Sequence, residues 1–336
     1  MSGLGDFLLW PGLAAFAASL LVTILMMRAG VMDEPGARSS HAAPTPRGGG
    51  LGIAAGLGAG AIAALSTPLA PQAVPALIAF TVLLSALGLA DDLVTPGPRL
   101  KFAVMALACL AAAWALGPVT RLALEPGGAG LALPLIAGLA GSALFLFVTL
   151  NAVNFLDGAD AMLAAVLIPS GAGLAVAGLS LGVLSATLAG VCLAGGLAGF
   201  LALNRPKAAV FAGDAGSLGA AALYGAGALA LASHGGAAGV WLAVLFIAPV
   251  LGDVLLTLLK RALGGRLSLQ AHREHAYQRL IARGWSHGAA AFLYCALSSA
   301  CVLTGLLAVQ LGGPAAPIAF AGWIAVLSAG YLAVAR

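Results

Sequence analysis

The sequence predicts an all-α membrane protein, a polytopic helical bundle with about eleven transmembrane helices. Of its 336 residues, 62% are hydrophobic and only 8% are charged, whereas about a quarter of the residues of a typical soluble domain are charged. The mean hydropathy is +1.07, and apolar runs of about 20 residues, enough to cross the hydrocarbon core, recur along the chain. Lipid cannot satisfy exposed backbone groups and the runs lack the two-residue alternation of barrel strands, so the spans are expected to be helices.

Eleven apolar runs are long enough to be spans. We expect them near residues 7–27, 49–66, 74–90, 101–116, 134–150, 161–178, 182–203, 216–232, 238–258, 288–310 and 315–335. The break at 178–182 and the connection at 204–217 are the weakest boundaries, so ten spans is the alternative. We find no fixed-period repeat and no separate soluble domain, and treat residues 1–336 as one membrane domain. The 47 glycines suit close helix packing in lipid.

The charged residues divide between the two faces that eleven spans would create. One face holds residues 28–48, 91–100, 151–160, 204–217 and 259–287 together with the C-terminus. All Lys and Arg residues except Arg121 lie on or beside this face, as do all acids except Asp6 and Glu125. Cytoplasmic loops carry such a basic excess, so this face is predicted to be cytoplasmic, with the N-terminus outside and the C-terminus inside. The net charge of +4 calls for no nucleic-acid partner.

An acidic pair, Asp91 and Asp92, closes the third predicted span, and Arg99 and Lys101 open the fourth. Two adjacent carboxylates at a lipid boundary repel each other unless a cation intervenes. Such a pair suits a general base or a divalent metal. A polar helix end is the structural alternative.

Four polar residues at strict three-residue spacing follow the fifth span: Asn151, Asn154, Asp157 and Asp160. Residues three apart share a helix face, so they would form one polar stripe aimed into the bundle. The alternative is a helix end with Asn and Asp caps.

A glycine-flanked acid, Asp214, precedes the eighth span and follows Asn204, Arg205 and Lys207. Glycines let the backbone approach a phosphate, and a helix N-terminus favours anions. An acid in this setting indicates a site for a metal and a phosphate together, with an ordinary N-cap as the alternative.

Two further loops on the same face carry histidines and arginines. The longest contains His272, Arg273 and His275, and histidines three apart can share a helical face and bind a metal or a phosphate. The first carries His41 and Arg47 ahead of a glycine turn. The alternatives are an interfacial segment on anionic lipid heads and a simple loop.

Together these clusters predict metal-assisted phosphoryl transfer on one membrane face, in which catalysis is mostly positioning and charge neutralisation. A catalytic face made by a membrane bundle implies that one substrate is a lipid. The alternative from another class is a secondary transporter, which would place its site near the midplane rather than at one edge.

The motifs resemble those of the polyprenyl-phosphate N-acetylhexosamine-1-phosphate transferases, the superfamily in glycosyltransferase family 4 that includes phospho-MurNAc-pentapeptide transferase and the enzymes that start O-antigen synthesis. The resemblance covers most of the chain. It rests on five motifs in family order: the glycine turn at 44–50, Asp91-Asp92, the stretch from Asn151 to Asp160, the stretch from Gly213 to Ser217, and the histidine loop.

The resemblance implies transfer of a sugar-1-phosphate from a UDP-N-acetylhexosamine to undecaprenyl phosphate, with release of UMP. It implies Mg²⁺, with Mn²⁺ as an alternative, and a multi-pass protein of the bacterial cytoplasmic membrane whose active site faces the cytoplasm. It does not fix the oligomeric state, for which a homodimer is one alternative. The roles implied for site residues are catalysis by Asp91, Asp92 and Asp157, metal binding by Asp214 and Asp160, and substrate binding by Asn151, Asn154, Asn204, Arg47, His41, Lys101, His272, His275 and Arg273. Base catalysis by Asp92 and covalent catalysis by Asp91 both remain open.

Three departures favour the branch that begins O-antigen and related surface glycans. Thr95 stands where the peptidoglycan enzymes have a lysine, with Arg99 and Lys101 as substitutes further on. The tight histidine triplet of those enzymes is replaced by a looser run around His275, and His41 stands near an expected lysine. Phospho-MurNAc-pentapeptide transferase is therefore the alternative within the enzyme class.

Overall fold

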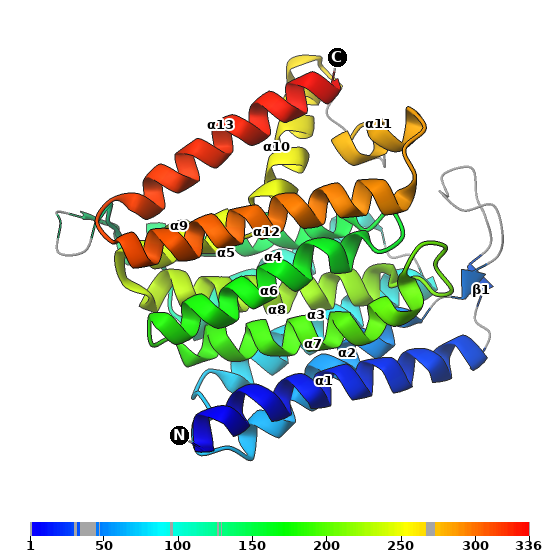
Figure 1. The fold of residues 1–336 in the computed structure, drawn as a ribbon, viewed down its shortest axis with the longest axis horizontal. Helices are drawn as coiled ribbons and strands as arrows, with labels where there is room; N and C mark the ends of the chain where they lie inside the picture. Colours follow the sequence, from blue (N-terminus) through cyan, green and yellow to red (C-terminus); the bar gives the residue numbers. More distant parts are fainter. Residues whose placement is uncertain are drawn as a thin grey trace.

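A computed structural model shows a helical bundle, with thirteen helices and two very short hairpins among the residues that it describes (Figure 1). It describes residues 2–29, 32–33, 45–46, 48–94, 97–125, 128, 130–266 and 273–335. The helices are α1 Ser2–Ala29, α2 Gly49–Leu65, α3 Val74–Val94, α4 Pro98–Leu116, α5 Leu135–Leu156, α6 Met162–Ser180, α7 Leu184–Asn204, α8 Gly213–His234, α9 Gly236–Leu245, α10 Ala248–Leu263, α11 Ala276–Ala282, α12 His287–Leu311 and α13 Ala315–Ala335. The antiparallel hairpins pair β1 Met32–Asp33 with β2 Thr45–Pro46, and β3 Arg121–Leu122 with β4 Leu131–Ala132.

All eleven predicted spans are helical, and their ends lie within two helical turns of the predicted ones. Among the described residues, nine helices are long and apolar enough to cross a membrane, or ten when the bent pair α9 and α10 is counted as one span. Helix α2, with 17 residues, stands at the lower limit of spanning length. The uncertain break at 178–182 is real, because α6 ends at Ser180 and α7 begins at Leu184. The all-α membrane bundle is confirmed.

The predicted span at 238–258 is wrong in one respect, because it is not a single straight helix. Helix α9 ends at Leu245, α10 begins at Ala248, and their axes differ by 62°. Pro249 lies in the first turn of α10, where its missing N–H is tolerated, whereas inside a continuous helix it would break the ladder. In Figure 1, α10 stands steeply across the other helices. The loop that follows contains a short helix, α11, that the apolar pattern did not indicate.

Glycines allow the helices to approach closely, as their abundance suggested. On α2, a Cβ at Gly56 would lie 2.6 Å from the carbonyl oxygen of Ala15 in α1, and one at Gly60 would lie 2.7 Å from Cys192 Sγ in α7. Small residues at such contacts permit the backbone packing that holds membrane helices together. The α1, α2 and α7 layer therefore depends on residues without side chains.

Helix α8 is the centre of the bundle (Figure 1). It packs against α2, α3, α5, α6, α7 and α9, and 94% of its most apolar 18-residue window is buried. By contrast, only 11% of the corresponding window of α13 is buried. The helix that carries Asp214 is thus surrounded by protein.

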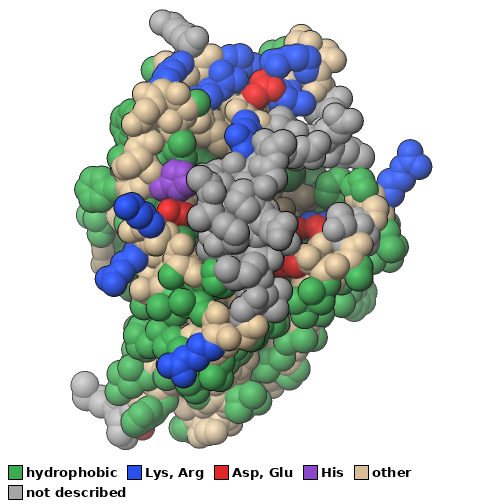
Figure 2. Space-filling view, turned by 90° about the vertical axis from the view of Figure 1, so that its right-hand side faces the viewer, with side chains coloured by type: hydrophobic (Ala, Val, Ile, Leu, Met, Phe, Trp, Pro, Cys, Tyr) green, Lys and Arg blue, Asp and Glu red, His purple; other side chains and the backbone are tan. Residues whose placement is uncertain are grey.

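Polar side chains gather at one end of the bundle. Figure 2 shows this end, where Lys, Arg, acidic and histidine side chains lie among hydrophobic ones at the rim. It is the end at which α3 and α5 terminate and α4 and α8 begin, so the predicted motifs meet there. Its orientation toward the cytoplasm stays a prediction.

Candidate active site

Four helix ends bring the central residues together. Asp91 and Asp92 lie in the last turn of α3, Lys101 in the first turn of α4, and Asp214 at the first turn of α8. Asn154 comes from the last turn of α5. Segments more than a hundred residues apart in the sequence therefore contribute to one cluster at a bundle end, as the topology predicted.

A single ammonium group connects two of the carboxylates. Lys101 Nζ lies 2.6 Å from Asp91 Oδ2 and also contacts Asp214 Oδ2. The lysine side chain is only 12% exposed, against 18% for Asp91 and 29% for Asp214. Partial burial strengthens such contacts relative to surface ion pairs, which contribute little. The two acids thus flank one cation, as neighbouring carboxylates in one site do.

Asn154 holds the other oxygen of Asp214. Its amide nitrogen donates to Asp214 Oδ1 at 3.0 Å and is 2.9 Å from Ser217 Oγ. Asn151, one turn earlier, donates instead to the Phe147 carbonyl of its own helix at 2.7 Å. Of the two predicted asparagines on this stripe, Asn154 is the one that reaches α8.

Asp92 has a different geometry from its neighbour. Its two oxygens accept hydrogen bonds from the backbone N–H groups of Asp214 and Ala215, both at 3.1 Å. A carboxylate at a helix N-terminus binds unsatisfied N–H groups and favours the positive end of the helix dipole. Asp92 therefore anchors the start of α8 to the end of α3, and base catalysis by this residue remains a prediction.

Two glycines make this anchoring geometrically feasible. Gly213 has φ +64°, and a Cβ there would lie 2.7 Å from Asp92 Oδ2. A Cβ at Gly88 would collide with the carbonyl group of Asp214. The close approach of α3 and α8 beneath the carboxylates thus requires glycine on both helices.

Asp157 caps the C-terminus of α5 and lies partly buried near the same cluster. Burial, and then the charges of Asp214 and Asp92, raise the pKa of the Asp157 carboxyl well above its ordinary value. Desolvation and like charges both disfavour the ionised form. A cation in the cluster would act against the contribution of these two charges.

Asp160 and Asn204 lie in an adjoining network rather than on Lys101. Asp160 accepts from the Ala208 N–H at 3.3 Å and lies 3.4 Å from His287 Nδ1. Buried Asn204 accepts from the Ala161 N–H at 3.0 Å and donates to the Val210 carbonyl at 2.7 Å. Both residues tie the α5–α6 connection to the α7–α8 connection, and their predicted roles in metal and nucleotide binding stay predictions.

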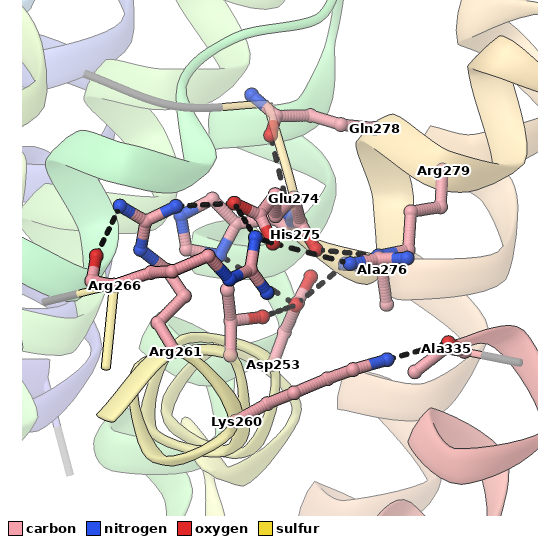
Figure 3. A network of polar contacts seen from close by, with 11 residues as sticks. Asp253, Lys260, Arg261, Arg266, Glu274, His275, Ala276, Gln278, Arg279 and Ala335 are labelled. Atoms are coloured by element: carbon pink, nitrogen blue, oxygen red, sulfur yellow. Dashed lines mark hydrogen bonds and ion pairs between the residues drawn. The ribbon is translucent and has the colours of Figure 1, made fainter. Parts of the chain in front are cut away.

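The histidine loop is held by a buried carboxylate that the motifs did not identify, Asp253 of α10 (Figure 3). Asp253 accepts from the Ala276 N–H at 2.7 Å and from the Tyr294 hydroxyl at 2.5 Å, and it lies 3.6 Å from His275 Nδ1. His275 is only 3% exposed. The available signal was an acid inside an apolar run, which is costly unless it has a purpose.

A cluster of charges surrounds Glu274 (Figure 3). Its carboxylate contacts Arg261, lies 3.0 Å from Arg266 and 3.5 Å from Arg279. Partial burial opposes ionisation of Glu274, but the charges of Arg266 and Arg261 outweigh it and lower the pKa of Glu274. The cluster fixes the two ends of the α10–α11 connection to each other. Arg273 is exposed beside it, whereas His41, Arg47 and His272 lie outside the described residues.

Helix α11 and the glycine turn both contact the central motifs. The Tyr277 hydroxyl donates to the Phe155 carbonyl at 3.1 Å, and the His275 ring stacks on Phe155 with centroids 6.0 Å apart. Burial, and then the charges of Asp253 and Asp157, raise the pKa of Tyr277 above its ordinary value, so this hydroxyl stays a donor. On the other side, Gly49 N–H donates to the Phe211 carbonyl at 3.0 Å. All five predicted motifs are therefore parts of one connected region.

The described ranges contain no group of three or more His, Cys, Asp or Glu side chains arranged to hold a metal ion. The reason is visible in the cluster, since Lys101 lies between Asp91 and Asp214 and Asp92 is committed to backbone N–H groups. The arrangement can hold one positive charge among oxygen ligands and present Lys101 to an anion.

Comparison with known proteins identifies the family. The model of glycosyl transferase family 4 matches residues 74–232. The phospho-N-acetylmuramoyl-pentapeptide-transferase of Symbiobacterium thermophilum is 34% identical over 305 residues, which cover 82% of this chain and 88% of that protein. The chain belongs to glycosyl transferase family 4. The resemblance to polyprenyl-phosphate hexosamine-1-phosphate transferases inferred from the motifs is confirmed.

This family 4 transferase is also similar to decaprenyl-phosphate N-acetylglucosaminephosphotransferases. It is 28% identical over 323 residues to the protein of Mycolicibacterium smegmatis, covering 85% of this chain and 77% of that protein. It is 29% identical over 311 residues to that of Mycobacterium tuberculosis H37Rv, covering 79% and 72%. The family match runs from α3 to α8 and so includes Asp91, Lys101, Asn154 and Asp214, whereas the histidine loop lies beyond it.

Proposed function

We propose that this protein transfers an N-acetylhexosamine-1-phosphate from a UDP-sugar to undecaprenyl phosphate and releases UMP. The step would begin the synthesis of O-antigen or a related surface glycan, on the cytoplasmic face of the bacterial inner membrane. The observation that carries the proposal is the cluster of Asp91, Lys101 and Asp214, built from three helix ends at one edge of a membrane bundle. The similarity to the mycobacterial decaprenyl-phosphate N-acetylglucosaminephosphotransferases supports it.

The position of the cluster suits a reaction between a lipid and a soluble nucleotide. A polyprenyl chain keeps its phosphate at the membrane edge, where the cluster lies, and a nucleotide sugar reaches the same edge from the aqueous side. A transporter would instead place its ionisable residues near the midplane. The location of the acids at the ends of α3, α5 and α8 therefore supports the enzyme.

In the proposed reaction, an oxygen of the lipid phosphate attacks the β-phosphorus of the UDP-sugar. The bond between that phosphorus and the bridging oxygen breaks, and UMP leaves with the electron pair. The product is a lipid diphosphate sugar, so atoms and charge balance without a redox partner. The protein contributes mainly position and charge compensation, as is general for phosphoryl transfer.

The residues of the cluster fit Mg²⁺. Carboxylate oxygens are its preferred ligands, and Mg²⁺ in phosphoryl-transfer sites takes one or two carboxylates together with substrate phosphates. Asp214 and Asp91 already hold a cation between them, and Asp157 lies near enough to feel the charge of Asp214. These three acids would hold the metal, which supplies charge neutralisation and polarises the phosphoryl oxygens. Asn154 fixes the Asp214 carboxylate in position.

A second candidate is phospho-MurNAc-pentapeptide transfer, favoured by the 34% identity to the Symbiobacterium thermophilum protein. The departures at Thr95 and in the run around His275 argue against it. The two candidates differ in the soluble substrate, so one assay separates them.

The test offers purified protein, Mg²⁺ and undecaprenyl phosphate a panel of UDP-N-acetylhexosamines and UDP-MurNAc-pentapeptide, and follows UMP and the lipid product. UMP release with an N-acetylhexosamine supports the proposal. Release with the pentapeptide substrate alone would establish the second candidate, and release with none would refute both. Asp214→Asn should abolish turnover while the protein still purifies, and Asp6→Asn at the far end of α1 is the matched control.

A further inference from the structure

The cation between Asp91 and Asp214 is part of the protein itself. The Lys101 ammonium reaches them from the first turn of α4, and its side chain is only 12% exposed. It contacts one carboxylate from α3 and one from α8. A protein cation therefore occupies the space between the two acids that the proposed function assigns to a divalent metal.

Lys101 and a divalent ion cannot both occupy this space. The ammonium contacts Oδ2 of Asp91 and Oδ2 of Asp214, and a divalent ion held by these two acids would be repelled by the like charge of the ammonium. Asp92 is turned toward the start of α8, where its two oxygens accept backbone N–H groups. Metal binding at Asp91 and Asp214 is therefore opposed while the lysine stays and favoured when it leaves.

The structure permits that departure without loss of the surrounding packing. Asp92 ties α3 to α8 through the Asp214 and Ala215 N–H groups, so the helix contact does not depend on the lysine. Asn154 holds the second oxygen of Asp214. A lysine has a flexible four-carbon stem and binds phosphate as a point charge. It can therefore swing to a phosphate oxygen while the carboxylates keep their positions.

We propose that Lys101 is a resident counter-ion that competes with the divalent metal for Asp91 and Asp214 and transfers to a substrate phosphate when the nucleotide binds. This inference rests on the proposed function. Two consequences follow. The substrate-free protein binds metal weakly, and metal and phosphate each raise the affinity for the other, because linkage makes the coupling reciprocal.

The decisive experiment measures Mn²⁺ binding to the substrate-free protein by electron paramagnetic resonance. Lys101→Met removes the competing charge and should lower the Kd for Mn²⁺ by about tenfold or more, within the usual range of coupling between sites. The matched control is Lys260→Met, whose ammonium binds the Ala335 carbonyl at 2.6 Å, and its Kd should change by less than about twofold. An unchanged or higher Kd for Lys101→Met would overturn the inference.

The effect of UMP provides a second reading on the same samples. UMP should lower the Mn²⁺ Kd of the wild type by about fivefold or more and lower that of Lys101→Met by less, because direct contact between the metal and the phosphate is common to both proteins and only the wild type has the coupling through the lysine. Equal effects of UMP on the two proteins would count against the inference.

A measurement on the unmodified protein avoids any dependence on folding of the variant. An amine-reactive acetylating reagent should modify Lys101 faster with saturating Mn²⁺, since the side chain leaves its two carboxylates. Mass spectrometry measures the rate. Equal or slower acetylation would contradict the proposal. None of these measurements needs turnover. If the wild type is an active transferase but Lys101→Met has an unaltered affinity for Mn²⁺, this inference alone is refuted. If the wild type turns over none of the substrates, only the proposed function is refuted.

Discussion

Asp92→Asn tests whether the second acid of the pair anchors α8. The substitution keeps the size of the side chain and removes its charge and one acceptor. Asp92 accepts two backbone N–H groups at 3.1 Å, and an asparagine can accept only one of them while its NH₂ group faces the other. The start of α8 would then lose a hydrogen bond to a charged group and the favourable charge at its N-terminus.

The magnitude follows from these two losses. A hydrogen bond to a charged group contributes about 1.5–3 kcal/mol, and a carboxylate at a helix N-terminus contributes about 0.3–1 kcal/mol. The free energy of unfolding should therefore fall by about 2–4 kcal/mol. Asp91→Asn is the matched control on the neighbouring residue, since Asp91 bonds to Lys101 rather than to the backbone; it should cost less than Asp92→Asn, because Lys101 keeps its contact with Asp214.

The assay is unfolding in mixed micelles titrated with SDS, followed by tryptophan fluorescence on both variants and the wild type. Equal stability losses in the two variants, or a loss of less than about 0.5 kcal/mol in Asp92→Asn, would refute the anchoring role, because surface substitutions already vary by that amount.

Three further perturbations test other parts of the structure. Gly88→Ala places a methyl group against the Asp214 carbonyl and should cost about 1–3 kcal/mol through overpacking while slowing UMP release; Gly58→Ala, with nothing within 4 Å, should leave both unchanged. The pKa of Glu274 is lowered in the folded protein, so its contribution to stability is complete above its unfolded pKa and is lost as the pH falls through the folded pKa. Glu274→Gln should thus destabilise the protein at neutral pH and converge with the wild type in acid, and a constant difference in thermal midpoint across pH would contradict this. A cysteine replacing exposed Ala282 should react with an impermeant thiol reagent only from the cytosolic side, and labelling from outside would invert the topology.

The spans could be predicted because lipid imposes a length and a composition on each segment separately. The bend between α9 and α10 could not be placed by the same reasoning, since average hydropathy is insensitive to backbone direction. Pro249 was a local indication of it, because a proline in the first turn marks the start of a helix. The short α11 was not predicted for a related reason: it has only seven residues, and besides the local bond from His275 N–H to Gln278 it depends on Asp253 from another helix.

Convergence of the motifs could also be predicted, because alternating helix directions place their ends on one face. The hydrogen-bond and ion-pair partners of each acid on that face could not be predicted. Asp91 and Asp92 are equivalent acids in the sequence, yet one binds Lys101 and the other binds backbone N–H groups, which carry no sequence signal. Likewise, three-residue spacing placed Asp160 with Asn154, whereas the chain turns after Leu156 and brings Asp160 to His287.

The burial of α8 has a consequence for how the protein can vary. Its alanines and glycines are buried among the neighbouring helices, so a larger side chain at most positions of α8 would press on one of them. Tolerance of substitution should therefore decline steadily from the lipid-facing α13 inward to this helix. A change in sugar preference would then arise in the loops that connect the helices, such as the one between α10 and α11, while the sequence of α8 stays the same.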